Sequence, residues 1–147
     1  MLNKFMAAAL DQARIAAKKD EVPIGAVIVC NQEIIAATHN QNRELSDPTA
    51  HAEILALREA AAKKNSPRLD DCDLYITLEP CTMCAAAISL ARIRNVFYAC
   101  GDSKFGAVEN GANFFNSKSC HHKPEIYSGI NEEESRGLLQ EFFTKKR

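Results

Sequence analysis

This 147-residue sequence lacks three features that distinguish other protein classes from ordinary globular domains: a membrane span, an export signal, and repeats or linkers. No apolar run approaches the length of a membrane span. Residues 1–20 carry six charged side chains, whereas an export signal needs an unbroken apolar stretch. No repeat, linker or low-complexity segment is present. We therefore expect a single domain over residues 1–147, located in the cytoplasm, with no membrane partner.

Excess positive charge is also missing, since the formal net charge is −1 at pH 7. A strongly basic field that draws in nucleic acid is thereby excluded. Any contact with RNA has to come from local patches, of which the Lys145-Lys146-Arg147 end is one. Basic residues are also what the dipole of a solvated helix terminus favours, and this is the simpler explanation.

The sequence does contain six cysteines, and without an export signal they indicate reduced thiols and metal chemistry. Two of them stand in Pro80-Cys81-Thr82-Met83-Cys84, and His51-Ala52-Glu53 precedes that segment. An imidazole and two thiolates suit zinc, so we predict that His51, Cys81 and Cys84 bind one Zn²⁺ per subunit. Three protein ligands leave a fourth position open for water, as in a catalytic site.

Hydrophobic periodicity predicts helices that alternate with short strands. Helices are expected over 2–19, from Asp47-Pro48 to about 65, from 81 or 82 to about 92, and over 131–146. Strands are expected over 24–29, 33–38, 74–78, 96–100 and 125–128, with Asn31-Gln32 joining the first two as a hairpin. This alternation predicts an α/β fold, a three-layer α/β/α sandwich with a central mixed sheet of about five strands.

Both motifs are expected at helix beginnings. Cys81 and Cys84 are about one helical turn apart, and the N–H groups and dipole of a helix start favour their ionisation. Inside a helix, His51 and Glu53 would point about 200° apart, so both can reach one site only at the helix mouth. An N-cap at Asp47 followed by Pro48 is expected to provide that start.

A water on zinc beside a free carboxylate predicts hydrolysis. The pattern H-x-E…P-C-x-x-C resembles that of zinc nucleobase deaminases, which implies that the group removed is an exocyclic amine on a ring carbon. Zinc lowers the pKa of a bound water from about 15.7 to roughly 7. Glu53, close to that water without being a ligand, would accept its proton and pass it to the ring nitrogen and the leaving amine.

Two plainer interpretations compete with a catalytic zinc. A C-x-x-C segment after a strand is also the thioredoxin pattern, and a closed structural zinc site would need a fourth ligand. The cysteines and histidines that could supply it show no partner spacing with the motif: Cys72, Cys100, Cys120, His39, His121 and His122. We expect Cys30, Cys72 and Cys100 to be small buried hydrophobic residues.

The arrangement H-x-E…P-C-x-x-C resembles that of zinc nucleobase deaminases. Nearly the whole chain is similar to the cytidine and deoxycytidylate deaminase superfamily, and most of all to bacterial tRNA-specific adenosine deaminases. The segments that carry this resemblance are Glu21–Val27, His39-Asn40, Asp47–Ile54, Leu74–Ala85 and Glu141–Phe143. The zinc motif alone indicates the superfamily, whereas the other segments indicate the tRNA branch.

The resemblance implies deamination of adenosine to inosine at the wobble position of a tRNA anticodon, with an arginine tRNA as the expected substrate. It also implies a homodimer whose active sites lie near the subunit interface. Ile24 would pack against the base, Asn40 would hydrogen-bond it, and Ala52 would offer a backbone contact. The plainer readings are a core strand residue for Ile24 and a polar loop residue for Asn40.

The resemblance further places Asp102 and Lys104 along the anticodon loop, and Phe143 with the basic tail beside the nucleotides. Core packing is the plainer reading for at least one of Phe142 and Phe143. The chain departs from the commonest form of the family at Phe105, Glu109-Asn110 and Cys120-His121-His122, which leaves the contacts with neighbouring nucleotides open.

Two other functions remain possible at this point. A deaminase of a free base or nucleoside, such as guanine or cytosine, would share the zinc motif and differ in its pocket walls. An inactive zinc-bearing RNA-binding subunit is the second alternative. Glu53 argues against it, since such a subunit has no need of a carboxylate at that position.

Overall fold

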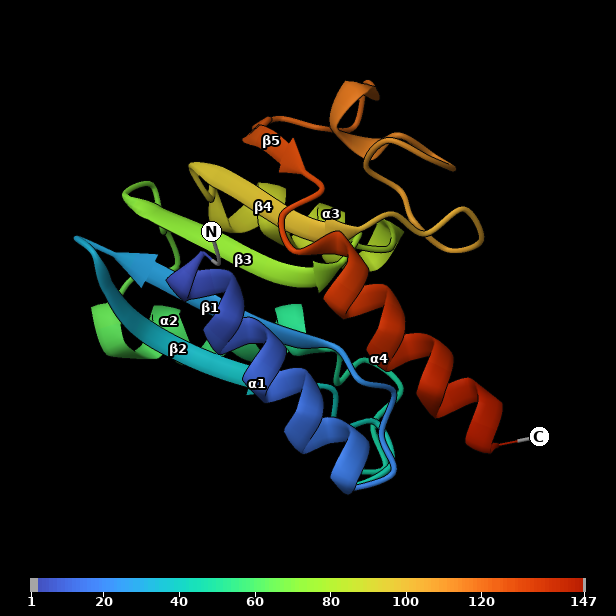
Figure 1. Ribbon diagram of the computed structural model, residues 1–147. Helices are drawn as coiled ribbons and strands as arrows, with labels where there is room; N and C mark the ends of the chain where they lie inside the picture. Colours follow the sequence, from blue (N-terminus) through green and yellow to red (C-terminus); the bar gives the residue numbers. More distant parts are fainter. Residues whose placement is uncertain (1–2, 147) are drawn as a thin grey trace.

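Five strands form one mixed sheet in the order β2-β1-β3-β4-β5 in the computed structural model, which describes residues 3–146 (Figure 1). β1 is antiparallel to both of its neighbours, whereas β3, β4 and β5 run parallel. The strands are β1 (Gly25–Cys30), β2 (Glu33–His39), β3 (Cys72–Leu78), β4 (Asn95–Cys100) and β5 (Glu125–Ser128). The predicted mixed sheet of about five strands is therefore confirmed.

Helices cover both faces of this sheet, as the sandwich prediction requires (Figure 1). α1 (Lys4–Lys18) and α4 (Glu132–Lys145) lie on one face, and α2 (Ala52–Lys64) and α3 (Thr82–Ala91) lie on the other. A short 3-10 helix, η1 (Phe114–Asn116), interrupts the long segment before β5. None of the helices within residues 3–146 is long and apolar enough to cross a bilayer.

Alternate residues of the central strands belong to two separate hydrophobic cores, one on each face of the sheet, because successive strand side chains point to opposite faces. Ala26 and Ile28 of β1 pack with α2 and α3, whereas Val27 and Val29 pack with α1. Gly25 begins β1 where α1 crosses it. A Cβ at that position would lie 2.0 Å from the carbonyl oxygen of Ala9, so only glycine allows the helix to approach so closely.

The hairpin between β1 and β2 forms where it was predicted. Asn31 and Gln32 have φ values of 52° and 65°, and two successive positive φ angles give a two-residue turn whose twist matches that of the strands.

The start of α2 was predicted wrongly. The helix begins at Ala52 with His51 as its N-cap, and not at Asp47-Pro48. The Asp47 carboxylate accepts hydrogen bonds from the backbone N–H and the hydroxyl of Thr49, both at 2.8 Å, and so forms a separate turn. The chain is extended at His51, with φ −73° and ψ 151°, before the helix starts. Consequently His51 and Glu53 lie at the helix mouth, which is where the predicted chemistry needs them.

Candidate active site

The two motifs meet at one edge of the sheet because two helices begin there. His51 is the N-cap of α2 and Cys81 is the N-cap of α3, and Glu53 and Cys84 lie in the first turns of the same helices. Neither N-cap side chain makes a capping hydrogen bond to its helix. Both side chains are therefore free to turn toward a common point.

Three ligand atoms converge at that point. The Nδ1 atom of His51 lies 3.6 Å from the Sγ of Cys81 and 3.4 Å from the Sγ of Cys84. Tetrahedral zinc, with Zn–S of about 2.3 Å and Zn–N of about 2.0 Å, places such atoms about 3.6 Å apart. The donor set and its spacing thus fit a zinc ion.

The electrostatics favour thiolate at Cys81. Its pKa is lowered to about 4, chiefly because the Cys84 thiol hydrogen-bonds its sulfur and also because His51 contributes a hydrogen bond and charge. A thiolate is the form that binds metal.

Glu53 lies where the predicted acid–base group has to be, in the first turn of α2 beside the ligand atoms. Its carboxyl is 4% exposed, and burial raises its pKa to about 7. A carboxyl that titrates near neutrality exchanges protons efficiently with a substrate. Glu53 is also outside the three-atom ligand group, as predicted for a proton carrier.

A cavity of about 880 Å³, called here the His51 cavity, opens beside this group and is lined by His51, Glu53 and Cys81. Five of the six residues predicted to contact substrate line it as well: Ile24, Asn40, Asp102, Lys104 and Phe143. The structure therefore brings together residues that are separated by more than a hundred positions in the chain.

Ala52, the sixth residue, is fully buried. Its N–H donates to the Oδ1 of Asn40 at 2.8 Å, and its carbonyl accepts from the hydroxyl of Thr38 at 2.7 Å. Asn40 thus holds the start of α2 with its oxygen, which leaves its amide NH₂ for other partners. The contact of Ala52 with a base stays a prediction.

Glu79 is a site residue that the sequence reasoning missed. This carboxylate is 3% exposed and follows β3, directly before the zinc motif. Its oxygens accept backbone N–H bonds at 2.9 to 3.1 Å from four residues of the next loop: Asp102, Val108, Glu109 and Asn110. The side chain of Asn110 adds a fifth bond at 2.7 Å. Burial by itself raises the pKa of Glu79, but these bonds outweigh it and the net pKa is lowered.

The last helix supplies one wall of the His51 cavity. Phe143 is 49% exposed and lines the cavity, whereas Phe142 is half-buried and meets the Phe143 ring edge-on at 5.4 Å. Lys145 pairs with Glu141 at 3.1 Å, and Lys146 pairs with Asp20. Two charges of the basic tail are therefore partly neutralised within the chain, and Arg147 lies outside the described residues.

The remaining cysteines and histidines do not complete a fourth ligand within residues 3–146, because the ligand group at His51 contains only Cys81 and Cys84 besides. Cys30, Cys72 and Cys100 are buried as predicted. A second group of possible ligands joins Cys30, Asp71 and Cys72. There the ammonium of Lys64 lies 2.6 Å from Asp71 and 3.3 Å from the Cys30 sulfur, so a cation already fills that position.

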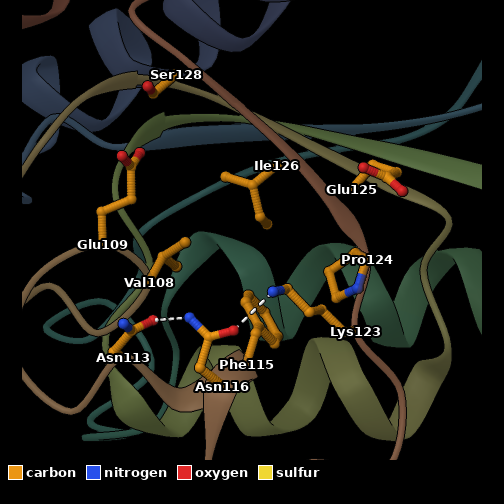
Figure 2. A pocket seen from close by; sticks show the side chains of 10 residues that line it. All are labelled: Val108, Glu109, Asn113, Phe115, Asn116, Lys123, Pro124, Glu125, Ile126 and Ser128. Carbon is orange, nitrogen blue, oxygen red and sulfur yellow. Dashed lines mark hydrogen bonds between the residues drawn. The ribbon is translucent and has the colours of Figure 1, made fainter.

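A second hollow, called here the β5 cavity, measures about 520 Å³. It lies beside β5 and η1, and Figure 2 shows the ten side chains that line it. Lys123 donates to the Asn116 amide oxygen at 2.6 Å, and Asn116 donates to Asn113 at 2.9 Å (Figure 2). His122, close in sequence, accepts a bond from Ser89 through its carbonyl and contacts the Ile93 carbonyl through its ring, which indicates a structural role.

Comparison with known proteins matches residues 1–100 to the model of the cytidine and deoxycytidylate deaminase zinc-binding region. A tRNA-specific adenosine deaminase of Agrobacterium fabrum is 54% identical over 97% of this chain and 94% of its own length. A solved structure from a study of A-to-I editing by tRNA:A34 deaminases at the wobble position of transfer RNA is similar, with a TM-score of 0.91 and 54% identity over 92% of this chain and 99% of that one. A guanine deaminase from Bacillus subtilis gives a TM-score of 0.65 and 31% identity, over 98% and 96% of the two chains.

Proposed function

The chain belongs to the cytidine and deoxycytidylate deaminase family, and we propose that it converts adenosine to inosine at the wobble position of tRNA. The reaction adds water to C6 of adenine and releases ammonia. The observation that carries this proposal is a buried carboxylate, Glu53, beside a three-atom zinc-binding group at the wall of an open cavity.

The residues of the chain divide the chemistry between them. His51, Cys81 and Cys84 would hold zinc, which when bound supplies the Lewis acidity that makes water a nucleophile at neutral pH. Glu53 takes a proton from the attacking water and delivers it to the ring nitrogen. It then takes the proton of the hydroxyl now bonded to C6 and gives it to the amine, which leaves as ammonia while C6 becomes a carbonyl. Because Glu53 is shielded from bulk water, its proton goes to the substrate and not to solvent.

The walls of the His51 cavity suit a purine. Ile24 offers an apolar surface to one face of the base, and the Asn40 amide can hydrogen-bond a ring edge. Ala52 is the expected backbone contact beside Asn40. A base has to leave its stack to reach Glu53, and the single-stranded anticodon loop makes this inexpensive in free energy.

The rim of the cavity favours RNA over a free base. Lys104 and Phe143 are exposed there, where they can meet phosphate and the nucleotides beside the target, and Asp102 shapes the same loop. A guanine or cytosine deaminase would have no use for these exposed groups. The homologues named for tRNA are also more similar to this chain than the guanine deaminase is.

The decisive experiment measures deamination by the purified, zinc-loaded protein, as ammonia release for every substrate and as inosine for the adenosine substrates. An anticodon stem-loop with adenosine at the wobble position is compared with free adenosine, guanine and cytosine. Activity on the stem-loop alone supports the proposal, whereas activity on a free base alone refutes it and leaves the zinc chemistry in place. Neutralising Lys104 should weaken activity on the stem-loop and flatten its salt dependence, without affecting a free-base enzyme.

The family resemblance extends the proposal to a cytoplasmic, RNA-binding homodimer. Leu90 of α3 is 81% exposed, and a subunit interface at α3 would cover this large apolar side chain. Sedimentation analysis of the protein and of Leu90→Lys tests this part. A dimer that persists at the same affinity in the variant would place the interface elsewhere.

A further inference from the structure

Phe105 is a large aromatic side chain exposed at the rim of the His51 cavity. It is 71% exposed, and it lines the cavity together with its neighbour Lys104. An exposed phenylalanine ring is apolar surface, and covering it with a bound partner is favourable in free energy. No described residue of the chain makes a ring-to-ring contact with Phe105, unlike Phe143, which meets Phe142.

The backbone around Phe105 is held firmly in spite of this exposure. The Asp102 carboxylate accepts the N–H bonds of Lys104 at 3.0 Å and of Phe105 at 3.1 Å. The N–H of Gly106 donates to the Asp102 carbonyl at 3.0 Å, and Gly106 also pairs with Cys81. The loop that presents Phe105 is thereby tied to a predicted zinc ligand.

Gly106 is required by this arrangement. A Cβ at that position would lie 2.4 Å from the Asp102 carbonyl oxygen and 2.5 Å from the Glu79 carboxyl carbon. The close contact of Gly106 with Glu79, together with the hydrogen bonds inside the loop, fixes the backbone position of Phe105 and hence the direction of its Cα–Cβ bond. A side chain presented in this way binds a planar partner with little loss of backbone entropy.

An exposed aromatic ring next to an exposed cation is the combination that binds a nucleotide of a single strand. The ring stacks on the base and the ammonium meets the phosphate. The interior of the cavity, beside Glu53, is where the target base has to sit, so a ring at the rim can reach only a neighbouring base. We propose that Phe105 is a stacking platform for the base of a nucleotide adjacent to the target adenosine. This inference rests on the proposed function.

If Phe105 stacks on a base, the Phe105→Ala variant should lose affinity for the stem-loop by a predictable factor. Stacking of one base on an aromatic side chain corresponds to a factor of about 5 to 150 in affinity. We expect KM for the stem-loop to rise by that factor while kcat changes little, since the reacting groups are untouched. Phe105→Tyr, which keeps a ring, should restore KM. Ile34→Ala, which removes another exposed apolar side chain at the far end of β2 from Asn40, is the matched control and should match the wild type.

A second substrate makes the test specific for stacking. Stem-loops that lack the base on the 5′ or the 3′ side of the target are assayed with the wild type and with Phe105→Ala. If the ring stacks on one of these bases, removing that base raises KM for the wild type and leaves KM for Phe105→Ala unchanged. Independent, multiplying effects of the two changes would overturn the platform, as would a Phe105→Ala variant with wild-type KM.

The two proposals fail in different ways in this experiment. A wild-type protein that forms no inosine in the stem-loop refutes the proposed function, and the platform falls with it. A wild-type protein that is active, and whose KM is insensitive to residue 105, refutes the platform alone.

Discussion

The His51 cavity and the β5 cavity have volumes of the same order, about 880 and 520 Å³. In the β5 cavity, polar side chains bond one another: Lys123 with Asn116, Asn116 with Asn113, and Glu109 with Tyr98. In the His51 cavity, Glu53 is buried with a raised pKa, and two sulfurs and an imidazole face one point. A cavity can bind a ligand when its polar groups are positioned but not bonded to one another. Its volume alone does not show whether it is a binding site.

The largest loss of activity should come from removing the Glu53 carboxylate, which lines the His51 cavity. Glu53→Gln is expected to lower turnover by about 10²- to 10⁴-fold, the usual contribution of a positioned acid–base group. Zinc content and melting temperature should remain those of the wild type, because Glu53 is not a ligand. Glu125→Gln, the same change in the β5 cavity, is the matched control and should keep full activity. Wild-type turnover in Glu53→Gln would refute the mechanism.

Removing a ligand should cost both metal and stability. Cys84→Ser is expected to lose zinc, measured by atomic absorption of the purified protein, and with it the stabilisation that bound zinc provides. That stabilisation is about 2.7 kcal/mol when free zinc is 100 times its Kd. Cys120→Ser serves as the control, since Cys120 contacts Ser89 and belongs to neither group of possible metal ligands. Equal zinc in the two variants would exclude Cys84 as a ligand.

Glu79 connects the two cavities. The loop that its carboxylate bonds, residues 102–110, contributes side chains to both of them. Glu79→Gln replaces one acceptor oxygen with an NH₂ group that faces N–H donors, so a buried bond is exchanged for a repulsion. Urea unfolding should show a loss of about 1 to 3 kcal/mol. KM for a stem-loop should rise as well, because Lys104 and Phe105 lose their support. A variant with wild-type stability would mean that the five bonds to Glu79 are dispensable.

A smaller, pH-dependent effect is expected at His39, which precedes Asn40 of the cavity wall. Burial, assisted by the charge of Lys19 and opposed by those of Glu44 and Glu21, lowers the pKa of His39. The unfolded chain therefore takes up the proton more readily, and stability is lost as pH falls below about 6.5. Gln12 contacts the Nδ1 of this ring at 3.0 Å.

His39→Gln cannot take up that proton. Between pH 7.5 and 5.5 its free energy of unfolding, measured in urea at each pH, should fall less than that of the wild type. A parallel decline in the two proteins would contradict the assignment of this dependence to His39.

The smallest effect is expected in the β5 cavity. Lys123→Ala breaks the bond to Asn116 at an exposed position, so stability should change by no more than about 0.5 kcal/mol. Inosine formation should stay within about twofold of the wild type, measured on the same stem-loop. A large loss of activity would show that the β5 cavity takes part in function and would end the contrast between the two hollows.

The predictable parts of the molecule were those encoded by local patterns. Short apolar runs located the strands to within a residue or two, and the residue types of His51, Cys81 and Cys84 indicated the ligand group, because both are local properties of the sequence. The start of α2 was misplaced because Asp47 can cap either a helix or a turn, and its bonds to Thr49 decided for the turn.

Glu79 could not be predicted in this way. The groups that bond it lie 23 to 31 residues further on and are mostly backbone N–H groups, which leave no mark in the sequence. The one available signal was an acidic residue directly after an apolar strand, where burial demands partners. The exposure of Phe105 was equally invisible, since it depends on how that same loop is folded.

The two N-cap positions given to metal ligands have a consequence for how the protein matures. An ordinary helix gains about 1 kcal/mol from a side chain that closes its first turn, and α2 and α3 both forgo this at His51 and Cys81. A bound ion ties these two helix starts to each other across the sheet edge. Metal uptake should therefore act as a late folding step. When the ion binds, fraying at the first turns of α2 and α3 should decrease together. Protein synthesised under zinc starvation is expected to show faster amide exchange at the beginnings of both helices.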